Sequence, residues 1–357
     1  MRNHNIFKNL KIIELASVLA GPAVGQFFAE LGATVIKIEN KKTGGDVTRK
    51  WKLPKENKDD LFSAYYHSIN WGKESMMLDL SDKEDKSIAI DLIAEADILI
   101  ANFKKGSAKK LGLDFGFFKN INQRLIYANM CAYGEQDGRS GFDVLMQAET
   151  GFLYMNGEAK RPPVKMPVAL IDILAAHQLK EAILIALLKR KETGKGNYIS
   201  VSLVKSAIAS LANQASNWLN TGHIPQRMGT QHPNISPYGD IFLTKDKKEI
   251  ILAVGTEKQF AELCDILNLK EIKSDKRFSK NINRLKYRNE LIEILEKAFL
   301  NFNQKELLEK FDAKKVPAGT IRNMQQVFDL PEAKEMVLEN KDGNKCVRTI
   351  AFEIGKN

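Results

Sequence analysis

The most regular pattern of apolar residues in the chain lies between Pro167 and Gly196. Apolar side chains recur there at spacings of three and four residues, which predicts a helix with one buried face. The predicted core positions are Ile173, Ala176, Leu179, Ala182, Ile183, Ala186 and Leu187. A Thr-Gly pair at 193–194 and three basic residues at 189–191 are typical of a helix end, where the dipole is negative.

Asp172 opens this predicted helix and has apolar residues on both sides. An aspartate at a helix start most often caps the free backbone N–H groups. It can also act as a nucleophile, because the helix dipole keeps the carboxylate ionised while apolar neighbours remove water and raise its reactivity. Position alone favours the capping interpretation, so the choice between the two depends on the rest of the chain.

Short apolar runs alternate with helical patterns through the N-terminal half of the chain. Strands are predicted at 10–15, 34–38, 78–80, 98–100, 125–130 and 198–203, with helices at 21–31, 83–94 and 204–220. This alternation predicts an α/β fold, a Rossmann-like domain with a parallel sheet. The glycines at 21, 25 and 32 do not fit the GxGxxG fingerprint, so no nicotinamide cofactor is expected.

Four lysines follow the predicted strand at 98–100, at the edge where open α/β sheets bind ligands. They are Lys104, Lys105, Lys109 and Lys110. Such a cluster is either a solvated helix face or a clamp for a diphosphate, and the sequence leaves both interpretations open.

The pattern changes after residue 222. Two alternating runs, 241–244 and 249–254, predict a hairpin, and helical patterns follow at 257–267, 285–300 and 304–311. We therefore expect a large domain over 1–205, to which residues 321–357 return, and a small α+β domain over 222–320.

Composition narrows the class of partner. The 357 residues carry a net charge of +10, spread over dispersed lysines, and no zinc-finger, RNP or base-reading helix pattern is present. A phosphate-bearing small ligand is therefore favoured over nucleic acid. There is no apolar run long enough for a membrane span and no signal-peptide pattern, so a cytoplasmic location is expected. The three cysteines and five histidines have no metal-ligand spacing, and no metal is expected.

Seven segments, taken in order, resemble the class III CoA-transferase family, which includes formyl-CoA transferase, carnitine CoA-transferase and, as a branch, α-methylacyl-CoA racemase. They are LKIIELASVLAGPAVGQFFAELGATVIKIE, GKESMMLDL with ADILIANFKKGSAKKLGL, GRSGFDVLMQAETG, ALIDILAAH, ETGKGNYISVSL, QHPNISPYG with DKRFSKNINR, and VPAGTIRNMQQVF. The resemblance covers essentially the whole chain.

The resemblance implies the chemistry at Asp172, which matches the family's aspartate. That residue would attack an acyl-CoA thioester and pass through an aspartyl anhydride and an aspartyl-CoA thioester before a second carboxylic acid leaves with coenzyme A. Backbone N–H groups at the helix start would receive the developing oxyanion. A dicarboxylate such as succinate is a common partner among relatives. The family also implies a homodimer of interlocked rings.

The resemblance implies the coenzyme A site less completely. Residues that match the family's pattern are Val18, Leu19, Asn102 and Phe103, with basic residues near Lys73 and Lys110. Where formyl-CoA transferase has an arginine after its second strand, this chain has Asn40. Lys41 is the adjacent candidate, although a lysine lacks the planar two-pronged contact of an arginine.

This sequence departs from the family's pattern at two places, and these departures leave alternatives to a transferase function. The racemase branch has a Gly-His-Asp turn, whereas this chain has Phe142 between Gly141 and Asp143, and a phenyl ring transfers no proton. His177 is predicted to be structural, because side chains meet three or four residues apart on a helix. The chain also ends at Asn357, without the family's PxLGEH-like segment. A racemase, and a paralogue that binds CoA esters without catalysis, therefore remain as alternatives.

Overall fold

The computed structural model describes residues 6–355, which form two units. The first unit runs up to Phe152, from Lys165 to Asn213 and from Pro331 onward, and the second comprises Leu153–Val164 and Gln214–Leu330. Residues 153–164 thus group with the second unit, although the sequence placed them in the first. Their backbone explains this, because the Arg227 guanidinium donates to Tyr154 O at 2.7 Å and Gly229 N donates to Gly157 O at 2.9 Å.

The first unit contains a six-stranded sheet in which every strand pairs in parallel. The strands are β1 (Lys11–Leu15), β2 (Thr34–Asn40), β3 (Glu74–Leu78), β4 (Ile98–Ala101), β5 (Ile126–Cys131) and β6 (Tyr198–Ser202). Their order is β3-β2-β1-β4-β5-β6, the doubly wound order of a dinucleotide-binding sheet. The predicted Rossmann-like parallel sheet is confirmed.

One predicted strand lies in the wrong place. The sequence predicted residues 78–80, but β3 ends at Leu78, which pairs with Asn40 of β2. Beyond it Asp79 N donates to the Asp85 carboxylate at 2.8 Å, which turns the chain into the next helix. Pairing with β2 therefore decided the position of this strand.

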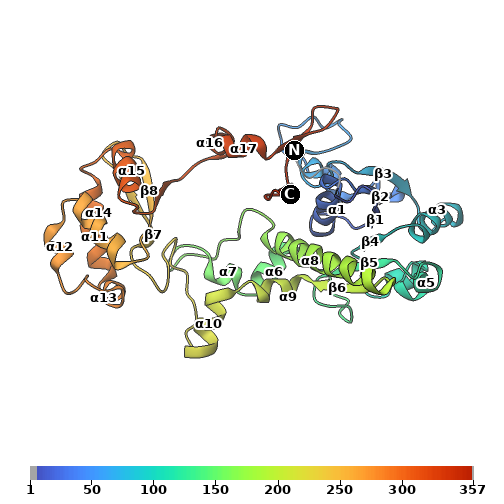
Figure 1. Ribbon diagram of the computed structural model, residues 1–357, viewed down its shortest axis with the longest axis horizontal. Coiled ribbons are helices and arrows are strands. Elements are labelled where there is room, and N and C mark those ends of the chain that lie inside the picture. The colour runs from blue at the N-terminus through green and yellow to red at the C-terminus, as the bar shows by residue number, and fades with distance from the viewer. Residues whose placement is uncertain (1–5, 356–357) are drawn as a thin grey trace. The chain divides into compact units, whose positions relative to one another are not determined.

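Helices cover both faces of the sheet. One core lies under α1 (Ala20–Glu30) and α8 (Leu170–Thr193), and another lies under α3 (Lys83–Ala94) and α5 (Phe115–Ile121). Helix α8 lies between α1 and α9 (Leu203–Ala209), as Figure 1 shows. Shorter elements complete the unit: η1 (Lys41–Thr43), η2 (Val47–Lys50), α2 (Ala64–His67), α4 (Ser107–Leu111), α6 (Asp143–Glu149), α17 (Pro331–Glu335), β10 (Val337–Glu339) and β11 (Lys345–Val347).

Helix α8 confirms the predicted central helix but corrects its buried face. Ile173, predicted to be buried, is 37% exposed, and Ala182 and Leu187 are only half-buried. Ile171 and Ala175 take the core positions instead. The predicted helix at 204–220 is likewise two helices, α9 and α10 (Ala212–Thr221), because the backbone of Ala212 adopts a positive φ of 46°.

The second unit contains an antiparallel sheet of β7 (Tyr238–Leu243), β8 (Glu249–Ala253) and β9 (Ala318–Thr320), which confirms the predicted hairpin. Its helices are α11 (Glu257–Ile266), α12 (Lys270–Ser274), α13 (Asn281–Lys286), α14 (Arg288–Phe299), α15 (Gln304–Ala313) and α16 (Met324–Phe328), with α7 (Phe152–Met155) at the junction of the units. Aromatic stacking of Phe242 on Phe299, with ring centroids 4.5 Å apart, lies in its core.

Candidate active site

Asp172 lies in the first turn of α8, two residues after Leu170, and is only 7% exposed. Its side chain does not cap the helix. The carboxylate of Asp143 takes that role, because its Oδ1 accepts hydrogen bonds from Ile171 N at 2.7 Å and from Asp172 N at 3.3 Å. The capping interpretation of Asp172 is therefore wrong, and the carboxylate is left for another role.

Asp143 is itself held in place by Gln147, one turn further along α6. The Gln147 Nε2 amide donates to Asp143 Oδ2 at 2.5 Å, and its Oε1 accepts from Met166 N at 2.9 Å. The segment before α8 is thus fixed to α6 by two side chains. Sequence reasoning named Asp143 only as part of the Gly-Phe-Asp turn and missed this role.

The same bonds correct the predicted oxyanion donors. Ile171 N and Asp172 N both donate to Asp143, and Leu170 N donates to Val168 O at 2.8 Å. These N–H groups at the start of α8 are therefore already paired within the protein. An oxyanion at this site needs donors from elsewhere.

Burial and the nearby negative charge of Asp143 raise the pKa of Asp172 to about 7. A carboxyl group removed from water favours its neutral form, and a second carboxylate close by adds to that preference. Close to neutral pH the group therefore exists in both forms. Strongly shifted acids of this kind cluster at catalytic sites.

Tyr65, on α2, adds a phenol to the surroundings of Asp172. Burial, followed by the charges of Asp172, Asp143 and Asp46, raises the pKa of Tyr65 to about 12, so its hydroxyl stays protonated and able to donate. Its ring packs edge-on against Trp51, with centroids 5.1 Å apart. Sequence reasoning missed Tyr65, which lies in a long polar stretch without periodicity.

The turn after β1 meets the end of β4, as the sequence predicted for a ligand-binding edge. Ser17 N donates to Asn102 Oδ1 at 3.3 Å, and Asn102 Nδ2 returns a bond to Ser17 O at 3.1 Å. Val18 and Leu19 follow directly, and Phe103 follows Asn102. Four of the predicted binding residues therefore lie at the carboxyl ends of two adjacent strands, where the strand order reverses.

A pocket of about 640 Å³ opens at this edge. Its lining comes from the ends of β1, β2 and β4, from the segment 40–50 and from the turn after β3: Leu15, Ala16, Ser17, Lys37, Ile38, Glu39, Asn40, Lys42, Thr43, Gly45, Asp46, Val47, Lys50, Asp79, Leu80, Ser81, Phe103 and Leu111. Phe103 and Leu111 supply apolar surface, while exposed lysines supply positive charge. Such a mixture suits a ligand with a flat base and phosphates.

The lysines of this pocket differ from those predicted. Lys42 and Lys50 line it, whereas Lys41 is exposed with its Nζ 3.9 Å from Asp85, and Lys110 is exposed on α4. Lys73 lies in the interior, because its ammonium contacts Glu14 Oε2 at 2.8 Å and Pro22 O at 2.8 Å. Spacing from the strand did not reveal which lysine side chains face the pocket.

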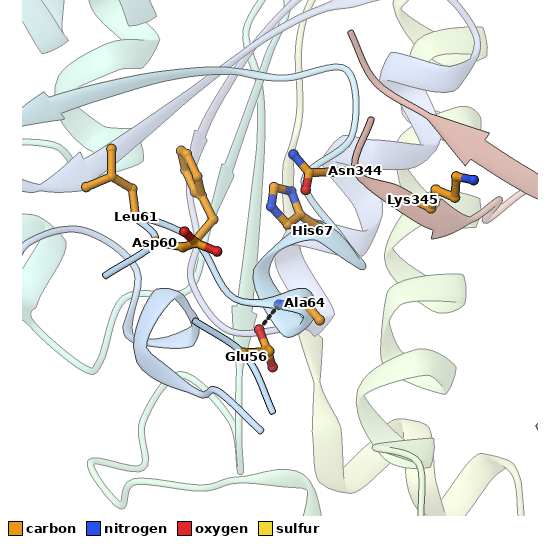
Figure 2. A pocket seen from close by; sticks show the side chains of 8 residues that line it. Glu56, Asp60, Leu61, Ala64, His67, Asn344 and Lys345 are labelled. Atoms are coloured by element: carbon orange, nitrogen blue, oxygen red, sulfur yellow. Dashed lines mark hydrogen bonds between the residues drawn. The ribbon is translucent and has the colours of Figure 1, made fainter. Parts of the chain in front are cut away.

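A second pocket, of about 510 Å³, lies beside α2 (Figure 2). It is lined by Glu56, Asp60, Leu61, Phe62, Ala64, His67, Asn344 and Lys345. Figure 2 shows Glu56 bonded to the backbone of Ala64, at 2.6 Å, with Asn344 from the β10–β11 hairpin beside His67. Burial lowers the pKa of His67. Residues of the C-terminal β10–β11 hairpin and of α2, the helix that carries Tyr65, therefore line the same pocket.

Comparison with known proteins agrees with this geometry. The family model described as CoA-transferase family III matches residues 7–354. The chain belongs to this family. It is 37% identical to the succinate–glutarate CoA-transferase of Agrobacterium fabrum over 94% of this chain and 85% of that protein. It is 33% identical to the human succinyl-CoA:glutarate CoA-transferase over 93% and 75%.

A solved structure supports the fold directly. A CAIB/BAIF family protein from Brucella suis superposes with a TM-score of 0.84, at 37% identity, over 98% of this chain and 93% of that one. The predicted family is therefore confirmed, and the protein is a CoA-transferase. Among residues 6–355 there is no cluster of three metal-binding side chains, and no helix there is long and apolar enough to cross a membrane.

Proposed function

We propose that the protein transfers coenzyme A from an acyl-CoA thioester to a free carboxylic acid, with Asp172 as the covalent nucleophile. The observation that carries this proposal is a buried carboxyl group whose pKa is raised to about 7 and whose expected capping role another acid performs. A carboxylate with a raised pKa is more basic, and a desolvated one is more reactive.

The reaction then proceeds in balanced steps. The ionised Asp172 attacks the thioester carbonyl, the C–S bond breaks, and coenzyme A leaves as a thiolate from an aspartyl anhydride. The thiolate attacks the aspartyl carbonyl and releases the donor acid, which leaves an aspartyl-CoA thioester. The acceptor carboxylate attacks this thioester, the C–S bond breaks, and coenzyme A leaves again as a thiolate from a second anhydride. Finally the thiolate attacks its acyl carbonyl, which frees Asp172 and the new CoA ester.

The chain's own residues supply the setting for these steps. Asp143 and Gln147 fix the start of α8 and thereby the direction of the Asp172 carboxylate. The protonated Tyr65 hydroxyl is our candidate donor to the developing oxyanion, since the N–H groups of α8 are occupied. Such a donor in a water-poor site stabilises charge that appears only in the transition state.

The pocket at the carboxyl ends of β1, β2 and β4 is our candidate site for the nucleotide part of coenzyme A. Phe103 offers a ring beside the base, and Lys42 and Lys50 offer charge to phosphates. Val18 and Leu19 lie in the adjoining turn, to which Asn102 is bonded through Ser17. Lys41 and Lys110, which are exposed, remain candidates for contact with the phosphates of coenzyme A. Lys73 is buried and pairs with Glu14, so we propose that it supports the site from the interior.

The acids transferred are proposed from the relatives. The Agrobacterium and human proteins are named for succinate and glutarate, and both names denote short dicarboxylates. A net charge of +10 is compatible with dianionic substrates. We therefore propose succinyl-CoA as donor and a C5 dicarboxylate as acceptor.

The racemase alternative lacks a second proton carrier. Phe142 occupies the position of the racemase branch's histidine and precedes α6, while His177 is exposed on α8. One incubation distinguishes the alternatives. The protein is mixed with succinyl-CoA and glutarate in D₂O, and the CoA esters are analysed by mass spectrometry. We expect glutaryl-CoA without deuterium, and none with Asp172→Asn. Deuterium gained by unchanged acyl-CoA would instead establish the racemase.

A further inference from the structure

The turn between β1 and α1 contains a strained residue. Val18 has a φ of +74°, in the left-handed region that a β-branched residue rarely adopts. Its N–H group points at the Asp46 carboxylate, with Oδ2 at 3.2 Å and Oδ1 at 3.4 Å. Backbone strain of this kind persists only where the surroundings enforce it.

Asp46 is surrounded by hydrogen-bond donors. Besides Val18 N, it accepts from Thr48 N at 3.0 Å and Thr48 Oγ1 at 2.9 Å, and its Oδ2 lies 3.1 Å from Lys37 Nζ. Both carboxylate oxygens therefore face donors, and the side chain is almost fully buried. An asparagine in this place would turn an NH₂ group toward a donor in either orientation.

Lys37 binds the other side of the same turn. Its ammonium, 1% exposed, donates to Ala16 O at 2.7 Å and to Glu14 Oε1 at 2.9 Å. Lys73 also pairs with Glu14, with its ammonium 2.8 Å from Oε2. Two carboxylates and two ammonium groups thus form a buried, neutral cluster that holds the carbonyl of residue 16 and the N–H of residue 18.

The turn that this cluster holds forms part of the wall of the 640 Å³ pocket, which Ala16 and Ser17 line. We propose that Asp46 is a positioning residue for the CoA ester: it enforces the left-handed conformation of Val18 and so gives the turn its binding shape. This inference rests on the proposed function, because it takes the pocket to be the coenzyme A site. Asp46 acts through the backbone of Val18. Replacement of Val18 by glycine makes Asp46 unnecessary for this conformation, because glycine adopts a left-handed φ without strain.

The test is a double-mutant cycle in affinity for coenzyme A, measured by isothermal titration calorimetry. The proteins are the wild type, Asp46→Asn, Val18→Gly and the double variant. We expect Asp46→Asn to weaken binding about tenfold when Val18 is present, and less than about twofold in the Val18→Gly background. An equal loss in both backgrounds would overturn the inference. Thr48→Val, which removes one bond to Asp46, replaces Asp46→Asn if that variant does not fold.

Asp97→Asn is the matched control. The Asp97 carboxylate also accepts a backbone bond, from Lys11 N at 3.0 Å, and pairs with the buried Arg190 at 3.0 Å. These contacts lie at the opposite edge of the sheet, where β1 and β4 begin. For Asp97→Asn we expect a lower melting temperature and an unchanged affinity for coenzyme A. A reduced affinity in this control would overturn the inference, because loss of binding would then be a general effect of lower stability. A wild type that binds no coenzyme A refutes the proposed function, whereas equal binding by wild type and Asp46→Asn refutes this inference alone.

Discussion

At the scale of single residues, the helix cap that position suggested for Asp172 is supplied by Asp143. Asp143 lies 29 residues before Asp172 in sequence, yet it caps the helix on which Asp172 lies. Asp143 accepts hydrogen bonds from the N–H groups at the start of α8. The Asp172 carboxylate is therefore buried near a like charge without accepting those bonds itself. Its raised pKa of about 7 makes its ionisation measurable in two independent ways.

The first measurement is the pH dependence of transfer. Asp172 attacks only when ionised, so kcat/KM is expected to rise with pH and to level off above about 7. Below that pH the rate falls about tenfold per unit, as expected for one essential base. Initial rates of glutaryl-CoA formation between pH 5 and 9 test this. A midpoint near the ordinary aspartate value would contradict the assignment of Asp172 as nucleophile.

The second measurement is the stability of Asp172→Asn. The folded pKa lies above the unfolded value, so the ionisation of Asp172 costs stability as pH rises from about 4 to about 7, and the cost is constant above that. Replacement by asparagine removes this cost. We expect the variant to be about 2–4 kcal/mol more stable than wild type at pH 8, and to lose that advantage at pH 4. Chemical denaturation at both pH values measures it, with Asp91→Asn, an exposed change on α3, as the control.

At the scale of elements, the sequence predicted the helices and strands that have a strong internal pattern. The six parallel strands and α8 lie close to their predicted ranges, except β3, whose position depends on pairing with β2. Ile173, in the first turn of α8, shows the limit of periodicity, because it is exposed although the pattern predicted that it is buried. Which face is buried there depends on α6, through Asp143, and no spacing within α8 contains that information.

The contact of α6 with α8 gives an element-scale prediction. Asp143→Asn weakens the cap of α8 and removes the like charge beside Asp172, so we expect a loss of about 1 kcal/mol in stability and a lower pKa for Asp172. The midpoint of the kcat/KM profile should then move to lower pH. Asp82→Asn, which makes the same change in the side chain that caps α3, should leave the midpoint unchanged.

At the scale of the whole molecule, the first unit exposes several large apolar side chains. Ile185 and Leu188 of α8 are 66% and 67% exposed, and Ile208 of the neighbouring α9 is also exposed. Exposed aliphatic residues grouped on adjacent helices are typical of an interface. We propose that this surface contributes to a homodimer, the assembly that the family resemblance implies.

The dimer is tested by light scattering, where we expect a particle of twice 40.2 kDa. Leu188→Glu should lower its melting temperature by about 4 °C or more, because the interface would bury an unpaired charge. Lys189→Glu is a larger change of charge on the adjacent residue, which is exposed and polar, and should have a smaller effect. A monomer of 40.2 kDa for the wild type would refute the proposal.

The sequence by itself determined the alternation of strands and helices and the family, and it predicted Asp172 as the nucleophile, because these depend on local patterns and on the order of the segments. Tertiary structure alone decided that Asp143 caps α8, that Tyr65 lies within the electrostatic influence of Asp172, and that Lys42 and Lys50 rather than Lys41 line the pocket. The physical reason is common to all three. The burial of a charge, its pKa and the direction of a side chain depend on groups that are distant in sequence and close in space.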